Sequence, residues 1–199
     1  MPDDKRGRDK QARDADRRQR EREMRADLER GDEPEPPVET TELDEFESEL
    51  ESLAFPATGT EIVASVGDRA IASTGESYTV EQLLPETNAE TFDSPDAVRA
   101  AVQRPTVAAA MKRVVEASET LPDAQLDWSQ RKAYETTFRA LESVDADDDD
   151  ERIQAITDWI VDRIHDAETL PSSRDVRRRA AEFCRANGYR IRNDEWLGV

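Results

Sequence analysis

The second half of the sequence repeats apolar residues at spacings of three and four, and this constrains the fold more than any other feature of the chain. Three such stretches cover about residues 129–144, 150–167 and 173–186. Each stretch places its apolar side chains on one face of a helix, and Asn187-Gly188 is a typical helix end. The pattern predicts a three-helix unit, an outline shared by helix-turn-helix modules and by many other helical bundles.

The first half mixes helix and strand signals. The run "RAIASTGESYTV" has two β-capable segments around Thr74-Gly75, which predicts a hairpin. Thr79 with Gln82 is a capping-box pattern, and Ser94-Pro95 is an N-cap followed by proline at the first helical position. Apolar residues at helical spacing indicate a short helix ended by Gly67 and a longer later helix: Ile62, Val63 and Val66, then Val107, Met111, Val114 and Val115.

The N-terminal region is dominated by charge. Residues 1–30 contain eleven basic and nine acidic residues, so we expect a tail that is disordered or a solvent-exposed helix; an RNA-binding or ribosome-binding arm is the alternative. Residues 31–51 contain no basic residue, and three prolines there predict a linker. A short acidic amphipathic helix then follows from four apolar residues at helical spacing: Leu43, Phe46, Leu50 and Leu53.

These signals predict an α+β fold that is predominantly helical, with one hairpin in a small α+β unit ahead of the three-helix unit. The predicted organisation is a charged tail at 1–30, an acidic linker and short helix at 31–52, a small α+β domain at 53–118, and a helix-turn-helix-like unit at 119–199 that ends in a short strand at residues 189–192.

Two segments of the α+β unit resemble a known pattern. The stretch "LAFPATGTEIV", the hairpin and "TFDSPDAVRAAV" are similar to a family of small acidic haloarchaeal proteins of unknown function. The matching residues are Phe55, Pro56, Ala57, Thr58, Phe92, Asp93, Ser94, Pro95 and Asp96. The resemblance covers about a third of the chain. It implies a fold unit and a host, and it implies no activity.

The charge balance points to the same host. The chain has 47 acidic and 28 basic residues, a net charge of -19, and its basic residues are four lysines against twenty-four arginines. Acidic, lysine-poor surfaces are typical of proteins that work in molar salt, so we expect a halophilic archaeon; acidic mimicry of a nucleic acid is the alternative. At about 1 M salt the Debye length is about 3 Å, so net charge says little about partners.

Targeting and redox signals are absent from the sequence. No run of about 18 apolar residues is present and the N-terminus has no signal-peptide pattern, so we expect a cytoplasmic protein that has no membrane partner. Cys184 is the single cysteine, which excludes an intrachain disulfide.

No motif indicates catalysis. His165 has no cysteine partner near it, Cys184 lies on the inward face of its predicted helix, and "DADDDDE" does not fit a calcium loop. No glycine pattern for binding phosphate is present. We therefore expect a non-enzymatic protein with no cofactor, no metal and no small-molecule substrate.

The Arg-rich ending is the candidate nucleic-acid surface, with Arg178, Arg185, Arg190 and Arg192 as contact residues. A helical wheel puts Val176, Ala180, Phe183 and Cys184 inward, and Arg178, Arg185 and Ala181 outward. Against this reading, Glu182 lies one turn after Arg178, Asp175 lies one turn before Arg179, and residues 152–199 carry nine basic and eight acidic residues. Trp128, Trp159 and Trp196 are expected to form part of a compact core.

Two functions therefore stay open at the level of sequence. The first is an accessory protein that binds another macromolecule, with a protein as the expected partner. The second is a nucleic-acid-associated regulator that uses the C-terminal helix. Exposed, unpaired arginines would favour the second, and arginines paired with nearby acids would favour the first.

Overall fold

The computed structural model describes residues 35–73, 76–121, 126–144 and 149–189. The described residues from Pro36 onward form one compact unit. The predicted tail at 1–30 and most of the predicted strand at 189–192 lie outside the described residues.

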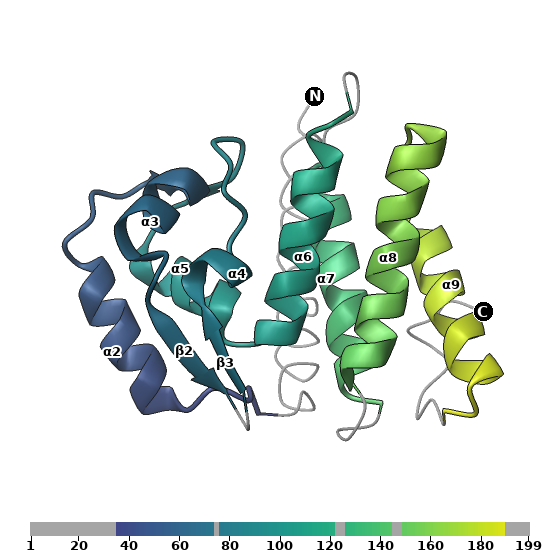
Figure 1. The fold of residues 1–199 in the computed structure, drawn as a ribbon, viewed down its shortest axis with the longest axis horizontal. Helices are drawn as coiled ribbons and strands as arrows, with labels where there is room; N and C mark the ends of the chain where they lie inside the picture. Colours follow the sequence, from purple (N-terminus) through teal and green to yellow (C-terminus); the bar gives the residue numbers. More distant parts are fainter. Residues whose placement is uncertain (1–34, 74–75, 122–125, 145–148, 190–199) are drawn as a thin grey trace, which may run out of the picture. The chain divides into compact units, whose positions relative to one another are not determined.

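Helices make up most of the described structure, which confirms the predicted α+β, predominantly helical class (Figure 1). The helices are α2 (Thr40–Leu50), α3 (Gly59–Val66), α4 (Val80–Leu83), α5 (Pro95–Val102), α6 (Pro105–Ser118), α7 (Trp128–Glu142), α8 (Asp149–Ala167) and α9 (Ser173–Ala186). The strands are β1 (Ala57–Thr58), β2 (Ala70–Ser73), β3 (Glu76–Thr79) and β4 (Thr91–Phe92).

The two segments that carry the family resemblance pair with each other. Strands β1 and β4 are antiparallel, with Ala57 opposite Phe92 and Thr58 opposite Thr91. Each segment also caps the helix that follows it. The Thr58 hydroxyl accepts from the N–H of α3, and the Ser94 hydroxyl does the same for α5. Thr58 and Ser94 thus serve local structure.

The predicted hairpin is confirmed. Strands β2 and β3 pair antiparallel, from Ala70 opposite Thr79 to Ser73 opposite Glu76. The Thr79 N–H then donates to the Gln82 side-chain oxygen at 2.9 Å, as the capping-box pattern predicts for the start of α4.

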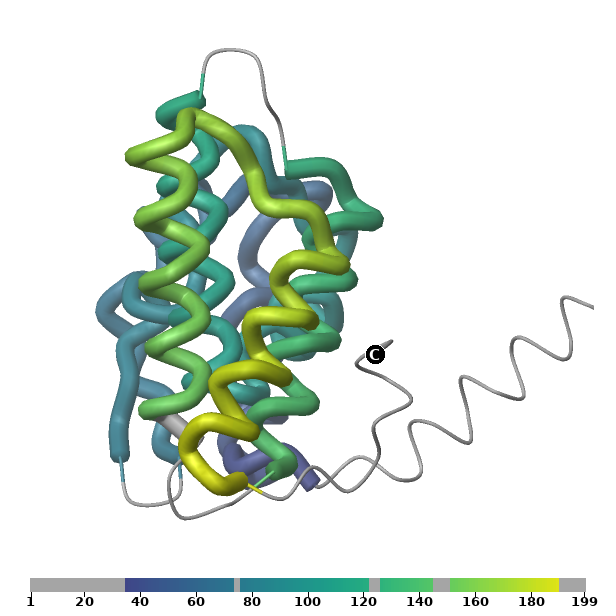
Figure 2. Tube along the Cα trace, turned by 90° about the vertical axis from the view of Figure 1, so that its right-hand side faces the viewer, coloured from purple at the N-terminus to yellow at the C-terminus, as the bar shows by residue number. Residues whose placement is uncertain are grey.

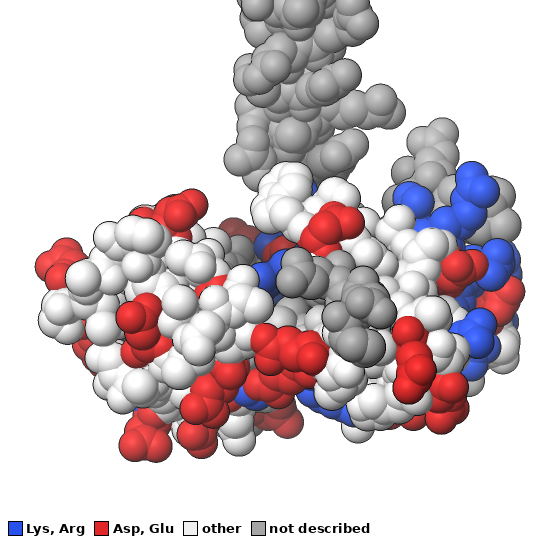
Figure 3. Space-filling view, turned by 90° about the horizontal axis from the view of Figure 1, so that it is seen from above, with Lys and Arg blue, Asp and Glu red and all other residues white. Residues whose placement is uncertain are grey.

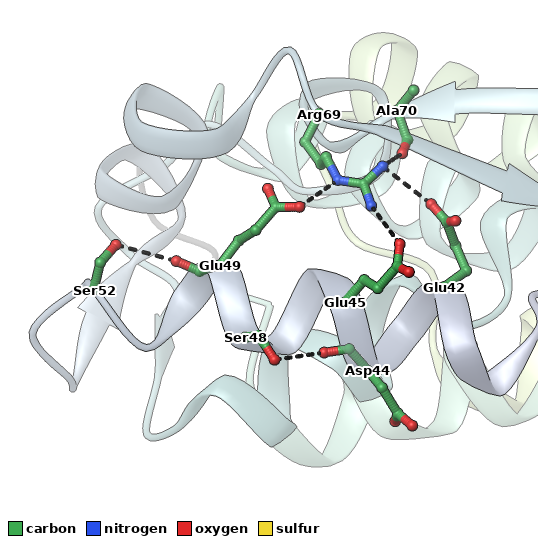
Figure 4. Close-up of polar contacts among 8 residues, drawn as sticks. All are labelled: Glu42, Asp44, Glu45, Ser48, Glu49, Ser52, Arg69 and Ala70. Atoms are coloured by element: carbon green, nitrogen blue, oxygen red, sulfur yellow. Dashed lines mark hydrogen bonds and ion pairs between the residues drawn. The ribbon is translucent and has the colours of Figure 1, made fainter.

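The first core lies among α2, the two strand pairs and α3 to α5. Its buried apolar residues run from Val38 to Ala108, and Phe46 and Leu50 of α2 are fully buried in it. Ion pairs also hold helix α2 in place. Arg69, which precedes β2, lies 3.1 Å from a carboxylate oxygen of Glu42 and 2.7 Å from one of Glu49 (Figure 4). The sequence predicted this helix, and the structure packs it into the core.

The second core joins α6, α7, α8 and α9. These helices lie side by side in Figure 1, and Figure 2 shows α8 and α9 antiparallel after the turn between them. The predicted inward residues of α8 are almost fully buried: Ile153, Ile156, Ile160 and Ile164. Helix α6 serves both cores, because Val107, Met111 and Val114 belong to the second and Ala108 belongs to the first. None of the described helices has the length and apolar character needed to cross a membrane.

A buried ion pair links α6 to α7. Arg104 directly precedes α6, and its guanidinium Nη1 lies 2.5 Å from Oε2 of Glu142, the last residue of α7. Their side chains are 6% and 8% exposed. Removal of one partner from such a pair leaves a buried charge without its counter-charge, and this costs about 3–5 kcal/mol.

We therefore expect Glu142→Ala to lower the free energy of unfolding by about 3–5 kcal/mol. The double variant Arg104→Met/Glu142→Met should recover most of this loss, because apolar residues of similar size often replace a buried ion pair without cost. Chemical denaturation of both variants and the parent measures the effect. A double variant no more stable than Glu142→Ala would contradict this assignment.

Candidate functional site

A cleft of about 380 Å³ lies between the first core and α7, and we call it the α5–α7 cleft. Helix α5 and the segment 83–93 form one wall, α7 forms the other, and α6 forms the floor. Its size falls within the usual range of ligand pockets, about 300–1,000 Å³.

Small side chains account for the open space. Ala97, Ala100 and Ala101 line the α5 wall, and Ala108 lies in the floor. Alanine carries no atoms beyond Cβ, so helices α5 and α7 can flank the cleft without filling it. The apolar part of the lining is completed by larger residues that belong to the two cores: Leu83, Leu84, Phe92, Val107 and Met111.

The α7 wall presents one aromatic and several charged side chains. Asp127 caps the helix by accepting from the Gln130 N–H at 2.9 Å, which sets Trp128 as the first helical residue. Trp128 is 74% exposed. The Lys132 ammonium, one turn later, lies 5.1 Å from the centre of its ring. The charged residues of this wall are Arg131, Lys132, Glu135 and Arg139.

The expected core position of Trp128 is therefore wrong. Trp128 precedes Tyr134 by six residues, and at about 100° per residue its side chain is turned about 120° away from the buried face of α7. Trp159 is partly buried against the second core, and Trp196 lies outside the described residues.

Glu90 faces Arg131 across the cleft and is positioned by the backbone around it. The Gly59 N–H donates to the Glu90 carbonyl at 3.1 Å, and the Thr60 N–H donates to the Thr87 carbonyl at 3.2 Å. A Cβ at Gly59 would lie 2.2 Å from the Pro85 carbonyl oxygen. This position therefore requires glycine for the close approach of two backbone segments. The start of α3 thus fixes the loop that carries Glu90.

The Glu90 carboxyl is buried and forms an ion pair with Arg131. Its second oxygen, Oε2, is buried and has no hydrogen-bond partner among the described residues. Burial raises the pKa of Glu90 above the usual 4.5, Arg131 opposes this shift, and Glu135 adds to it. Since the folded chain then holds this proton more tightly than the unfolded chain does, the protonated carboxyl favours folding below pH 4.5. That contribution is lost as the pH rises through the folded pKa.

We predict that the carboxyl carbon of Glu90 titrates in NMR with a midpoint above 4.5. Arg131→Met should raise this midpoint further, because it removes the charge that favours the ionised form. Arg113→Met is the matched control, since Arg113 pairs with Asp158 and does not line the cleft. A midpoint that stays the same in Arg131→Met would contradict the pairing.

The other candidate surface is the exposed face of α9, where two of the four predicted contact residues are described. Arg178 is 58% exposed and its Nη2 lies 2.5 Å from Oδ1 of Asp175. Arg185 is exposed and forms no ion pair with any described residue. Arg190 and Arg192 lie outside the described residues. In Figure 3, Lys and Arg gather on the α9 side with Asp and Glu among them.

The helical wheel predicted correctly which residues of α9 are buried at most of the positions it assigned. Val176, Ala180 and Cys184 are buried and Phe183 is partly buried against the second core, as predicted. Ala181 is buried although we predicted it to face outward, because the buried face extends one position further around the helix. The partner of Arg178 is Asp175, where Glu182 was the expected one.

The start of α9 is held by α7. The Tyr134 hydroxyl donates to the Pro171 carbonyl, and the Gln130 amide donates to the same oxygen at 2.8 Å. Burial raises the pKa of Tyr134 to about 12. Ser172 then caps α9 by accepting from the Asp175 N–H at 3.2 Å.

The residues considered for other chemistry have ordinary surroundings. Cys184 is buried, and burial raises the pKa of its thiol, which disfavours the reactive thiolate. His165 is exposed on α8. Within the described ranges, no group of three or more His, Cys, Asp or Glu side chains could hold a metal ion.

Sequence reasoning did not find the residues of the α5–α7 cleft. A wheel of the predicted helix at 129–144 could have placed Lys132 and Arg139 together on an outward face. The burial of Glu90 had no signal in the sequence, because it depends on backbone contacts with α3, which is distant in the sequence.

Residues 37–114 match the model of a family described as "Family of unknown function (DUF5789)". The matched stretch begins before α2 and ends within α6, so it covers the first core and both segments of the family resemblance. Helices α7 to α9 lie outside it, and the α5–α7 cleft lies between the matched and unmatched parts. No curated protein and no solved structure matches the chain.

Proposed function

We propose that this chain is a non-enzymatic accessory protein that binds another protein through the α5–α7 cleft. The observation that supports this most directly is Trp128, which is 74% exposed beside the cleft. Exposure of most of an indole ring to water is unfavourable. Tryptophan is also among the residues that most often dominate the binding energy of an interface.

We further propose that the protein works in the cytoplasm of a halophilic archaeon. The excess of acidic residues and the scarcity of lysine support this host. In molar salt, long-range charge attraction is screened, so a partner must be held by short-range contacts. An exposed aromatic ring and a shaped cleft provide contacts of that kind.

Affinity capture in molar KCl tests the proposal. The tagged full-length protein, Trp128→Ser and Trp128→Phe are each incubated with host lysate, half of it treated with nuclease, and bound proteins are identified by mass spectrometry. We expect a protein that survives nuclease and is retained by Trp128→Phe. The purified partner should bind Trp128→Ser at least about tenfold more weakly, as expected for loss of a central aromatic residue.

The proposal fails if purified candidates bind Trp128→Ser as tightly as the parent. It also fails if every captured protein is lost after nuclease treatment. Trp128 is mostly exposed, so its replacement should leave the free energy of unfolding within about 0.5 kcal/mol of the parent. Chemical denaturation of the variant checks this.

A second candidate function is nucleic-acid binding by α9, which the exposed arginines favour. Arg174 and Arg179 are exposed along with Arg178 and Arg185. A hollow of about 180 Å³ at the α8–α9 turn is lined by Trp159, Arg163 and Arg178, and Asp175 also lines it. Arginine forms short, bidentate hydrogen bonds with phosphate and guanine. Salt screens such short contacts less than it screens long-range attraction. The acidic neighbours weigh against this function.

The same capture experiment tests α9. If α9 binds nucleic acid, the parent recovers nucleic acid from the lysate and the double variant Arg178→Ala/Arg185→Ala does not. Arg113→Ala, which removes an arginine on α6, should recover as much as the parent. Equal recovery by the double variant and the parent would exclude α9 as the binding surface.

A further inference from the structure

We infer that the α5–α7 cleft binds an extended segment of the partner protein in which an apolar side chain and a carboxylate lie two residues apart. This inference rests on the proposed function and specifies the chemistry of the partner at that site. It follows from the hydrogen-bond donors in the cleft that have no acceptor among the described residues, and from the spacing between Lys132 and Trp128.

Two of the three acids that line the cleft are already engaged: Glu90 on the wall formed by segment 83–93, and Glu135 on the α7 wall. Glu90 pairs with Arg131, and Glu135 pairs with Arg139 at 2.5 Å. Across the cleft, Asp93 is exposed on the opposite wall, directly before the cap of α5. No carboxylate of the α7 wall is therefore left to attract a cation from a partner.

The cations next to Trp128 keep unused hydrogen-bond donors. Lys132 is exposed, and among the described residues its ammonium contacts the Trp128 ring and no carboxylate. The Arg131 side chain is 28% exposed and its ion pair with Glu90 uses Nη1, while a guanidinium has five N–H donors. The chemical group that complements both is a carboxylate.

The spacing of these groups sets the pattern of the partner segment. Trp128 and Lys132 are one helical turn apart, about 5–6 Å between their Cβ atoms. In an extended segment, residues i and i+2 point to the same side and lie about 6.6–6.8 Å apart. An apolar side chain on the Trp128 ring would therefore place the side chain two residues away beside Lys132.

Charge selects an acidic segment as the occupant. The chain carries a net charge of -19, but in molar salt the Debye length is about 3 Å, so only the charges that line the cleft bear on the choice of occupant. Cations outnumber acids in this lining, and Lys132 is the lining cation that forms no ion pair with a described residue. The cations are Arg104, Lys112, Arg131, Lys132 and Arg139, and the acids are Glu90, Asp93 and Glu135. A second copy of this chain is the other possible occupant, and the experiment separates the two.

The test uses the full-length protein in molar KCl and the peptide acetyl-Gly-Leu-Ser-Asp-Gly-amide. Two companion peptides replace Asp with Asn or Leu with Ser. Binding is followed by NMR at the indole N–H of Trp128, which is assigned with Trp128→Phe. We expect a saturable shift with the first peptide, and about fivefold weaker binding for each companion.

Two charge-reversal variants provide the matched control. Lys132→Glu should weaken binding of the acidic peptide by about fivefold or more. Arg113→Glu changes the net charge by the same amount on α6, outside the cleft lining, and should leave binding unchanged. Sedimentation of the parent and Trp128→Ser measures self-association under the same conditions.

Several results would overturn the inference. These are equal binding of the Asp and Asn peptides, an equal loss in Arg113→Glu and Lys132→Glu, or no shift at Trp128. A dimer that dissociates in Trp128→Ser would make a second copy the occupant. If the peptides fail while a captured protein still depends on Trp128, the proposed function stands and this inference alone is wrong.

Discussion

Helix α6 is buried on two sides, and the rest of the described structure depends on this. Its larger apolar side chains, Val107, Met111 and Val114, pack with α7 to α9, while Ala108 faces the first core. Only a helix with apolar residues on two faces can be shared in this way. Val107 and Met111 line the α5–α7 cleft along with Ala108, so the helix that joins the two cores also forms the floor of the cleft.

Ion pairs connect α7 to the opposite wall and to the floor of this cleft. Arg131 reaches from α7 to Glu90, and the buried pair of Arg104 and Glu142 ties the start of α6 to the end of α7. Removing the charged groups of both pairs from water costs free energy, so the pairs contribute little to net stability. They still constrain the position of α7, because separating the partners would leave buried charges unpaired. They hold α7 against the first core, and Trp128 lies outside either core because its side chain is turned away from the buried face of α7. The cleft is thus a product of the same contacts that join the two cores.

The sequence predicted the helices well and the cleft poorly, for physical reasons. Helical periodicity and caps are local, so the bounds of α7, α8 and α9 and the cap at Ser94 follow from residues within one or two turns. The burial of charged residues such as Arg104 is not local, since it arises when distant segments meet. The domain bounds at 118 and 119 remain a prediction, although α6 contributes to both cores. The contact roles of Arg178 and Arg185 also remain a prediction.

The central claim is that the α5–α7 cleft is the surface that meets a partner, and photo-cross-linking in living host cells tests it most directly. Benzoylphenylalanine is placed at Ala100, which lines the cleft, and separately at Arg185 on α9 and at Thr136 on the exposed side of α7. Our account predicts a discrete protein adduct from Ala100 and none from Thr136. Adducts from Arg185 alone, or equal adducts from all three positions, would contradict it.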